Sequence, residues 1–263
     1  MTSDDIVQTA HALADAAREA ILPFFRAEGL LSDNKARAGF DPVTEADRAA
    51  ERAMRDILAE RRPEDSVLGE EYGESRGTSG LTWVLDPIDG TRAFLSGTPT
   101  WGVLIAVSDE GGPVYGLIDQ PYTGERFEGG FGRSGMQGPQ GARALGTLPG
   151  RALSEAILFT TFPEVGSAAE REGFEAVARE VKLTRFGMDC YAYALLAAGQ
   201  IDLVIEAGLQ PYDVQAPIAV IEAAGGIVTD WQGQPAHGGG RVLAAAAPEQ
   251  HAAALEILSK VEG

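Results

Sequence analysis

Hydrophobic residues recur every three or four positions along the first part of the chain, which is typical of an amphipathic helix. The pattern predicts a helix from Asp4 to about Arg26, whose apolar side consists of Ile6, Ala10, Leu13, Ala17, Ile21 and Phe24. A second helix is predicted from Thr44 to about Glu60, because Thr44 and Asp47 are spaced as in a capping box. The polar residues between the two helices predict a loop.

Short apolar segments follow, each bounded by Gly, Pro or acidic residues, and such segments are typical of β-strands. Those of the first half are 67–68, 83–85, 102–107 and 116–118. Residues 129–150 carry many glycines and few large apolar side chains, and we interpret them as the junction between two halves. Beyond it, strands alternate with helices. The predicted strands are 156–160, 182–186, 202–206, 227–229 and 242–246, and the predicted helices are 167–180, 190–198, 214–224 and 249–261.

This order of elements predicts an α/β (α+β layered) fold, because helices and sheets bury their apolar faces against one another in layers. The 263 residues, of which 44% are hydrophobic, can form one large domain with a sizeable core. We expect a single domain over residues 1–263 in two merged halves. Residues 1 to about 135 are expected to hold helices and an antiparallel sheet, and residues from about 136 to 263 to form an α/β half.

The formal net charge of −18 argues against a nucleic-acid surface, which needs clustered Lys and Arg, and against an anionic membrane. Cys190 is the only cysteine, so no internal disulfide can form and a reducing compartment is expected. The first residues lack the basic start and apolar run of a signal peptide, and no stretch is long and apolar enough to span a bilayer. The sequence therefore predicts a cytoplasmic protein without nucleic-acid or membrane partners.

Four acidic residues stand near the ends of predicted strands or helices, namely Glu70, Asp86, Asp89 and Asp213. Carboxylates that emerge where apolar strands end can converge on one cleft, where their repulsion is costly unless cations lie between them. Hard oxygen ligands favour Mg²⁺ or Mn²⁺ over zinc, and the sequence has no His or Cys cluster that would bind zinc. We therefore expect a site for hard divalent cations.

The segment 86–91 reads Asp-Pro-Ile-Asp-Gly-Thr. Its proline biases Asp86 toward an extended conformation, so a tight turn can present both Asp carboxylates and the carbonyl of Ile88. Gly90 permits a close approach by phosphate, and the N–H groups of Gly90 and Thr91 can bind its oxygens if a helix begins there. Asp, Pro and Gly are also the usual turn residues, so an isolated segment of this kind is more often a plain turn. The partner carboxylates favour the metal site.

The chain resembles the inositol monophosphatase family over nearly its whole length. The resemblance lies in the order and spacing of Glu70, the segment 86–91, Pro211-Tyr212-Asp213 and the later Glu222-Ala223-Ala224-Gly225-Gly226. The resemblance implies the family's sugar-phosphatase fold, with alternating αβαβα layers, and a single catalytic domain that hydrolyses phosphate monoesters. It implies that two or three Mg²⁺ ions are bound by Glu70, Asp86, the Ile88 carbonyl, Asp89 and Asp213. It further implies catalytic roles for Asp47, Glu70 and Thr91, and phosphate binding by Gly90 and Thr91.

Two residues have structural alternatives. Asp47 stands at the acidic position of the predicted capping box, so it can cap the helix, act on the attacking water, or do both. Lys35 lies in the polar segment where the family has a mobile lid with a lysine, although an isolated loop lysine is usually only solvated.

Other phosphatase chemistries lack their residues in this chain. A cysteine phosphatase needs Arg six residues after its Cys, whereas position 196 is Leu. Haloacid-dehalogenase-type enzymes use Asp-x-Asp, whereas residues 86–89 read Asp-x-x-Asp. The three histidines lack an Arg-His-Gly context. Hydrolysis by metal-activated water is the chemistry that remains.

The expected substrate is a small phosphorylated metabolite, and two acidic residues bear on its alcohol. Glu206 matches a family position that contacts the leaving alcohol, and Asp189 can line the same pocket or cap the helix that follows it. Two carboxylates suit a cationic alcohol better than a neutral polyol. The surrounding residues, including Tyr212 and Ala93 where typical inositol monophosphatases carry Trp and Asn, resemble the histidinol-phosphatase branch of the family.

This branch resemblance implies hydrolysis of histidinol phosphate to histidinol and phosphate, a step of histidine biosynthesis. Inositol-1-phosphate or another sugar phosphate is the alternative substrate. The alternative outside enzymes is a metal- or phosphate-binding regulator on the same fold, and the intact set of predicted ligands with Thr91 speaks against it. The family resemblance also implies a homodimer.

Overall fold

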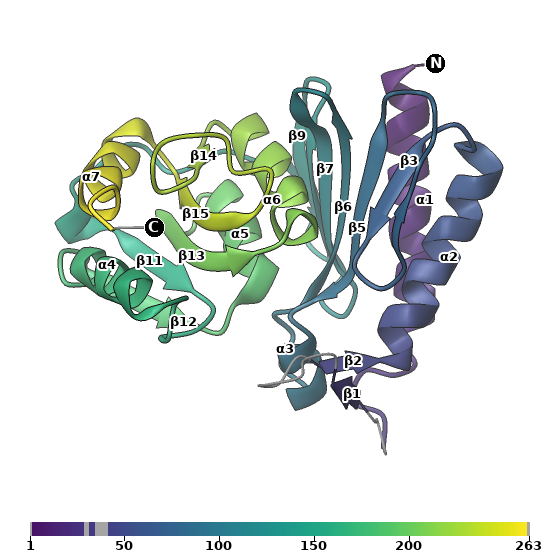
Figure 1. The fold of residues 1–263 in the computed structure, drawn as a ribbon, viewed down its shortest axis with the longest axis horizontal. Helices are drawn as coiled ribbons and strands as arrows, with labels where there is room; N and C mark the ends of the chain where they lie inside the picture. The colour runs from purple at the N-terminus through teal and green to yellow at the C-terminus, as the bar shows by residue number, and fades with distance from the viewer. Residues whose placement is uncertain (1, 29–31, 35–41, 262–263) are drawn as a thin grey trace.

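The computed structural model describes residues 2–28, 32–34 and 42–261, whose elements stack in five layers (Figure 1). The outermost layer of the first half is formed by α1 (Ser3–Ile21) and α2 (Glu45–Arg61), which pack on one face of an eight-stranded sheet. Next to the other face lie α5 (Asp189–Ala197) and α6 (Pro211–Ala223), followed by a five-stranded sheet. The last layer is α4 (Ala168–Ala178) and α7 (Pro248–Leu258). The expected αβαβα layering is confirmed.

The eight-stranded sheet has the order β10-β9-β8-β7-β6-β5-β3-β4. Its neighbours are antiparallel except for the parallel pair β3 and β5. Its strands are β3 (Ser66–Gly69), β4 (Gly73–Ser75), β5 (Thr82–Asp89), β6 (Gly102–Asp109), β7 (Gly112–Gln120), β8 (Glu125–Gly130), β9 (Arg133–Gly138) and β10 (Gly141–Ala144). A separate antiparallel pair is formed by β1 (Ser32–Asn34) and β2 (Pro42–Thr44).

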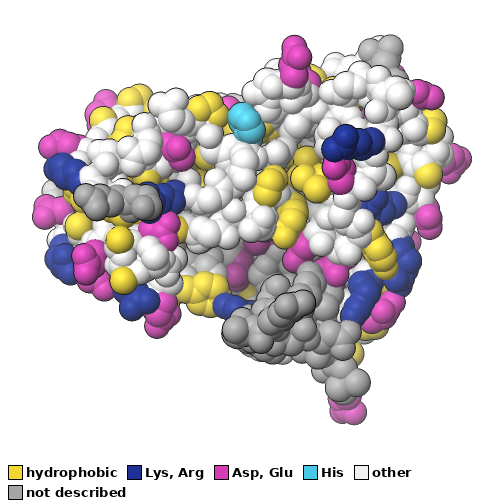
Figure 2. Space-filling model, viewed as in Figure 1, with side chains coloured by type: hydrophobic (Ala, Val, Ile, Leu, Met, Phe, Trp, Pro, Cys, Tyr) yellow, Lys and Arg dark blue, Asp and Glu magenta, His cyan; other side chains and the backbone are white. Residues whose placement is uncertain are grey.

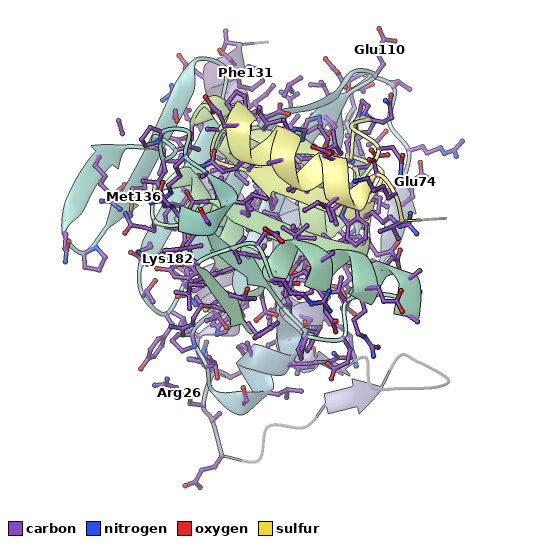
Figure 3. All side chains as sticks on the ribbon, turned by 90° about the vertical axis from the view of Figure 1, so that its left-hand side faces the viewer. Arg26, Glu74, Glu110, Phe131, Met136 and Lys182 are labelled. Atoms are coloured by element: carbon purple, nitrogen blue, oxygen red, sulfur yellow. The ribbon has the colours of Figure 1, made fainter. Side chains whose placement is uncertain are left out.

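The five-stranded sheet has the order β12-β11-β13-β15-β14. Strand β11 pairs in parallel with both β12 and β13, whereas β15 is antiparallel to β13 and β14. Its strands are β11 (Ile157–Thr160), β12 (Leu183–Phe186), β13 (Leu203–Leu209), β14 (Ile227–Thr229) and β15 (Gly240–Ala245), and a short 3-10 turn, η1 (Leu153–Glu155), precedes them. When the left-hand side of Figure 1 faces the viewer, α7 and α4 lie in front of the five-stranded sheet (Figure 3).

The central strands of each sheet are buried on both faces, because helices cover both faces there. Strand β6 shows this most clearly, since all of its residues from Gly102 to Ser108 are buried. Burial of a Val, Leu or Ile side chain contributes about 1.5–3 kcal/mol, so a strand buried on both faces reads as a continuous apolar run rather than an alternating one. This is why the sequence pattern located β6 directly.

Two glycines allow α6 to lie unusually close to the first sheet. A Cβ atom at Gly116 would lie 2.4 Å from the backbone oxygen of Ala216, and one at Gly129 would lie 2.5 Å from that of Ala219. Any side chain at either position would push the helix away from the sheet. The position of α6, which begins beside the candidate site, therefore depends on these two glycines.

The structure differs from the sequence-based elements in several places. The segment predicted as a loop between the first two helices contains β1 and β2, and β4 and β8 were not predicted. The first helix ends at Ile21 and continues only as turns toward Arg26. Strand β5 does not stop at Leu85 but runs on to Asp89. Residues 129–150, interpreted as a junction, contain β9 and β10, so the first sheet reaches Ala144, past the expected boundary near residue 135. The glycines in this stretch hid both strands, since glycine is depleted in strands.

Within the described ranges, no helix is both long and apolar enough to cross a membrane. On the face drawn in Figure 2, acidic side chains are spread over both halves and interspersed with Lys and Arg. The net charge of −18 is thus not gathered into one patch on that face.

Candidate active site

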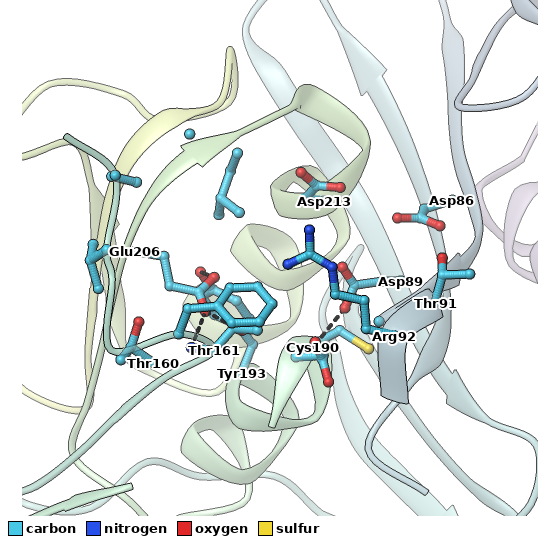
Figure 4. A pocket seen from close by; sticks show the side chains of 18 of the residues that line it. Asp86, Asp89, Thr91, Arg92, Thr160, Thr161, Cys190, Tyr193, Glu206 and Asp213 are labelled. Atoms are coloured by element: carbon cyan, nitrogen blue, oxygen red, sulfur yellow. Dashed lines mark hydrogen bonds between the residues drawn. The ribbon is translucent and has the colours of Figure 1, made fainter. Parts of the chain in front are cut away.

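A cavity of about 450 Å³ lies between the two halves of the molecule. Figure 4 shows Asp86 and Thr91 on one side of it and Glu206 and Thr161 on the other. The residues that line it come from β5, α3 (Thr91–Ser96), α5, α6, β13 and the segment after β11, and they include every acidic residue predicted for the metal site. These are Glu70, Asp86, Asp89 and Asp213.

Asp86 and Asp89 are presented by an irregular end of β5. The pairing of β5 with β6 shifts between these two residues, at the proline that lies between them. Proline cannot donate to the ladder, and it is found in sheets at such irregularities. The Ile88 N–H donates to Asp86 Oδ1 over 3.0 Å, which fixes the orientation of this carboxylate. The predicted tight turn is therefore the last, distorted part of a strand.

Asp213 approaches the same point from the first turn of α6. The Gln210 N–H donates to its Oδ2 over 2.7 Å, and a proline at the first helical position starts the helix. One carboxylate oxygen from each of Asp86, Asp89 and Asp213 lies within 4.8 Å of the other two. Three oxygens at this spacing could bind a metal ion.

Burial and mutual repulsion dominate the electrostatics of this cluster. Burial raises the pKa of Asp86 and of Asp89 well above the usual value for aspartate, and neighbouring carboxylates raise both further. Burial also raises the pKa of Asp213 to about 7, against the opposing effect of its hydrogen bond from Gln210. Each shift reports the cost of placing negative charges together away from water. Divalent cations would remove that cost.

Glu70 adds a fourth carboxylate to the cavity wall. It directly follows β3, and its N–H donates to the Leu85 carbonyl over 3.2 Å, which continues the pairing with β5. The charge of Glu70 contributes, after burial, to the raised pKa values of Asp86 and Asp213. Glu70 therefore lies close to the cluster, as the sequence predicted.

Gly90 and Thr91 form the turn between β5 and α3. Gly90 has a φ of +84°, a left-handed conformation that glycine adopts without strain, and α3 begins at Thr91 as the phosphate-binding hypothesis required. The Thr91 hydroxyl donates to the Ile88 carbonyl over 3.1 Å. The Ile88 carbonyl and Asp89, both predicted metal ligands, thus lie in one short segment with Thr91, the residue predicted to activate water.

Asp47 forms the capping box that its sequence position suggested. Its Oδ2 accepts hydrogen bonds from the Thr44 N–H over 2.8 Å and from the Thr44 hydroxyl over 2.5 Å. Its other oxygen, Oδ1, is buried and has no hydrogen-bond partner among the described residues. Burial raises the pKa of Asp47 to about 6, and the charge of Glu70 also contributes to this rise. Capping is therefore present, and one oxygen remains for a second role.

Glu206 is held on the opposite wall by three donors. The N–H and hydroxyl of Thr161 donate to its Oε1 over 2.9 and 2.6 Å, and the Tyr193 hydroxyl donates to Oε2 over 3.1 Å. The carboxylate is only 6% exposed, and burial raises its pKa. Oε2 accepts one hydrogen bond and can accept a second. The three hydrogen bonds hold the carboxylate in one orientation.

Asp189 lines the cavity but does not cap α5. The capping position is Met188, and Asp189 is the first helical residue with a φ of +46°, which is uncommon for a residue other than glycine. Its Oδ2 accepts from the Thr100 hydroxyl over 3.2 Å. Burial raises its pKa to about 6. The alternative of a helix N-cap is thus wrong, and the strained backbone aims the side chain into the cavity.

A model of the inositol monophosphatase family matches residues 3–262. This chain belongs to the inositol monophosphatase family. The chloroplastic bifunctional phosphatase IMPL2 of Arabidopsis thaliana is 42% identical over 88% of this chain, which spans 66% of that relative, just under two thirds. A histidinol-phosphatase of Streptomyces coelicolor is 37% identical, and the match covers 91% of this chain and 92% of that relative's length. The solved structure of an inositol monophosphatase from Zymomonas mobilis has a TM-score of 0.87 at 41% identity, covering 98% of this chain and 99% of its own.

As a member of the inositol monophosphatase family, the chain is a phosphatase of a metal-dependent class that acts on small phosphorylated substrates. The cluster of Asp86, Asp89 and Asp213 could hold the metal. The likeness to the Zymomonas mobilis structure extends over the entire fold, so both walls of the cavity belong to the shared architecture.

Sequence reasoning assigned no role to several residues that line the cavity. Tyr193 and Thr161 hold Glu206, Arg92 directly follows Thr91, and Phe162 follows Thr161. Tyr193 carried a weak signal, because it stands four residues after Asp189 on a predicted helix and so shares its face. Thr161 and Phe162 lie after a strand in a segment without a motif. Lys35, the proposed lid residue, falls outside the described residues.

Proposed function

We propose that this phosphatase hydrolyses histidinol phosphate with Mg²⁺, releasing histidinol and inorganic phosphate. The observation that carries the proposal is the two-sided cavity. One wall holds the carboxylate cluster that a metal-dependent phosphatase needs, and the other holds Glu206 and Asp189, which can pair with a cationic alcohol. The relative from Streptomyces coelicolor supports this choice, since it is named a histidinol-phosphatase.

The residues fit a hard divalent cation. All donors are oxygens, three of them converge within 4.8 Å, and the raised pKa values show that their charges need compensation. We assign Asp86, Asp89, Asp213, Glu70 and the Ile88 carbonyl as ligands of two or three ions. When bound, Mg²⁺ would stabilise charge on the phosphate and the leaving oxygen and lower the pKa of a nearby water.

The chain's own residues then orient water and phosphate. The Thr91 hydroxyl donates to the Ile88 carbonyl, so its oxygen is left to accept a hydrogen bond from the attacking water. We propose that Glu70 orients the same water and accepts its proton, and that Asp47, whose Oδ1 lacks a partner among the described residues, receives that proton from Glu70. The N–H groups at the start of α3, at Gly90 and Thr91, would bind phosphate oxygens.

On the other wall, Glu206 and Asp189 would select the alcohol. Histidinol carries an ammonium group and an imidazole, both of which can donate to carboxylates. Glu206 is fixed by Thr161 and Tyr193, so a substrate donor meets an acceptor that is already oriented. A hydrogen bond to a charged group contributes about 1.5–3 kcal/mol.

Inositol-1-phosphate is the second candidate substrate. It is favoured by the likeness to the inositol monophosphatase of Zymomonas mobilis, at 41% identity over nearly the whole chain. The two candidates differ in charge, since inositol is a neutral polyol. The same carboxylates would accept hydrogen bonds from its hydroxyls, which contribute less than bonds from an ammonium group.

The decisive experiment is phosphate release from a panel of monoesters with Mg²⁺ or Mn²⁺. We expect kcat/KM for histidinol phosphate to exceed that for inositol-1-phosphate by at least tenfold, and chelation by EDTA to abolish both activities. A preference for inositol-1-phosphate would overturn the substrate assignment. Release that persists in EDTA would overturn the metal-dependent mechanism.

We further propose that residues 1–263 act as one catalytic domain, in a cytoplasmic homodimer, as the family resemblance implies. Light scattering of the purified protein should give twice the mass of 27.7 kDa. A monomeric mass would contradict this proposal without affecting the assignment of the site.

A further inference from the structure

A cation rests on an aromatic ring at the mouth of the cavity. The Cζ atom of Arg92 lies 4.7 Å from the centroid of the Phe162 ring. Arg92 belongs to α3 in the first half and Phe162 to the segment after β11 in the second, and both line the cavity. Phe162 is 43% exposed although it is large and apolar. Figure 4 shows the Arg92 guanidinium reaching over the cavity toward the wall of Glu206.

The surroundings of this guanidinium are strongly acidic. Seven of the described residues that line the cavity are carboxylates, and Arg92 is the only Lys or Arg among them. Asp189 lies next to the start of α3, since a Cβ atom added at Gly90 would lie 2.8 Å from Asp189 Cγ. Burial raises the pKa of Asp189, and the charge of Arg92 opposes that rise. Glu206 is bonded to Thr161, the residue before Phe162.

Phe162, Asp189 and Glu206 all line this cavity, which therefore offers a cation one aromatic face and two carboxylates. A ring face attracts a cation within about 6 Å, and carboxylates attract it further. We propose that the space beside Phe162, Asp189 and Glu206 binds the cationic head of the leaving alcohol. Phe162 then determines the preference for cationic alcohols, and Arg92 competes with the substrate for this space. The inference rests on the proposed function and names the substrate class as phosphate esters of amino alcohols.

The proposal predicts changes of opposite sign at the two residues. Removal of the Phe162 ring takes away an attraction to the substrate cation, so selectivity falls. Removal of the Arg92 charge takes away a competitor, so selectivity rises. A cation over an aromatic ring is worth about 3-fold to 30-fold in binding, depending on how far it is desolvated.

The test compares kcat/KM for histidinol phosphate with that for inositol-1-phosphate at fixed Mg²⁺ and ionic strength. We expect Phe162→Leu to lower the ratio of the two values about 3-fold to 30-fold, Phe162→Tyr to keep it, and Arg92→Gln to raise it several-fold. Phe131→Leu is the matched control, because Phe131 is 40% exposed and does not line the cavity. In Figure 3 it lies at the opposite end of the view from Arg26, which is bonded to Gly97 directly after α3.

Two results would overturn the inference. Equal losses for both esters in Phe162→Leu would mean that the ring only supports the structure, and equal losses for both in Arg92→Gln would mean that Arg92 binds the phosphate common to them.

A second measurement does not depend on turnover. Histidinol, the alcohol without its phosphate, can be titrated into each protein by calorimetry, and we expect weaker binding to Phe162→Leu and tighter binding to Arg92→Gln. If no ester is hydrolysed but histidinol binding follows this order, the proposed function fails and the cation position stands. Equal dissociation constants for histidinol in all variants would overturn the cation position, whatever the enzyme hydrolyses.

Discussion

The backbone N–H of Cys190 donates a 2.6 Å hydrogen bond to Asp89 Oδ2. Asp89 lies at the end of β5 in the first half, and Cys190 is in the first turn of α5, a helix of the second half. This bond fixes the carboxylate so that its other oxygen can face the cluster, as outer partners commonly orient metal ligands. The first turn of α5 therefore positions Asp89 through Cys190 and places Asp189 in the same cavity.

Asp213→Asn should remove most turnover while the fold remains. The amide oxygen can still accept the bond from the Gln210 N–H, but the charge that pairs with a cation is lost. We expect kcat/KM to fall by on the order of 100-fold or more, because charge stabilisation by a metal is worth several kcal/mol. Circular dichroism should be unchanged. Asp109→Asn, at the exposed end of β6 and outside the cavity, is the control, and a loss below tenfold in Asp213→Asn would contradict the assignment.

Stability should depend on pH in a direction that Mg²⁺ reverses. The pKa values of Asp213, at about 7, and of Asp47 and Asp189, at about 6, lie above the 3.8 expected in the unfolded chain. Between pH 4 and 7 the folded state therefore binds more protons, and without metal these groups lower the free energy of unfolding as the pH rises.

Mg²⁺ pairs with the ionised forms, so its stabilising effect should grow over the same pH range. At 100 times its dissociation constant an ion adds about 2.7 kcal/mol, which corresponds to roughly 5–10 °C in Tm for a chain of this size. Thermal unfolding with Mg²⁺ or EDTA at pH 5.5 and pH 8 measures the difference. A shift in Tm that is larger at pH 5.5 would contradict the cluster as the binding site.

Glu206→Gln should change the choice of substrate more than the rate of the chemistry. The amide keeps an oxygen for Thr161 but loses the negative charge that attracts a cationic alcohol. We expect KM for histidinol phosphate to rise about 10-fold to 100-fold, as for the loss of a charge-assisted hydrogen bond, with a smaller change for inositol-1-phosphate. Glu164→Gln is the matched control for Glu206→Gln, because Glu164 is an exposed carboxylate that lines the same cavity. Similar effects of the two substitutions would mean that only the overall charge matters.

Gly90→Ala should impair both stability and activity. The left-handed φ of +84° costs about 1–2 kcal/mol for alanine, and the new Cβ would lie 2.8 Å from Asp189 Cγ. Asp189 must then move, so we expect kcat/KM to fall at least tenfold. Gly132→Ala separates the two effects, because Gly132 has a φ of +74° with nothing within 4 Å of the added Cβ. Denaturant unfolding should show a loss in both variants, and an equal kcat/KM would contradict the contact with Asp189.

The elements that the sequence located best are those whose pattern reflects their own surroundings. Strand β6 is apolar along its length because it is buried on both faces. The start of α2 could be predicted from the capping box of Thr44 and Asp47. Strands β8 to β10 were missed, because their glycines and polar residues pack at a sheet edge or allow α6 to approach, and such reasons lie in another part of the chain.

The site divides in the same way. Asp86, Asp89 and Gly90 stand in one segment whose turn chemistry is local, so the pattern revealed them. The bonds of Thr161 to Glu206 and the contact of Arg92 with Phe162 join segments that meet only in the folded chain. The strained φ of +46° at Asp189 likewise depends on its tertiary contacts, and its position relative to a predicted helix indicated a cap instead.

The two close glycine contacts of α6 have a consequence for how the enzyme can diverge. They allow α6, which carries Asp213, to lie close to the sheet that carries Asp86 and Asp89. The five-stranded sheet supplies Glu206 and the segment of Phe162, which take no part in these contacts. If Glu206 and Phe162 select the alcohol as proposed, substitutions after β11 or along β13 would change the accepted alcohol and leave the contacts between α6 and the first sheet in place.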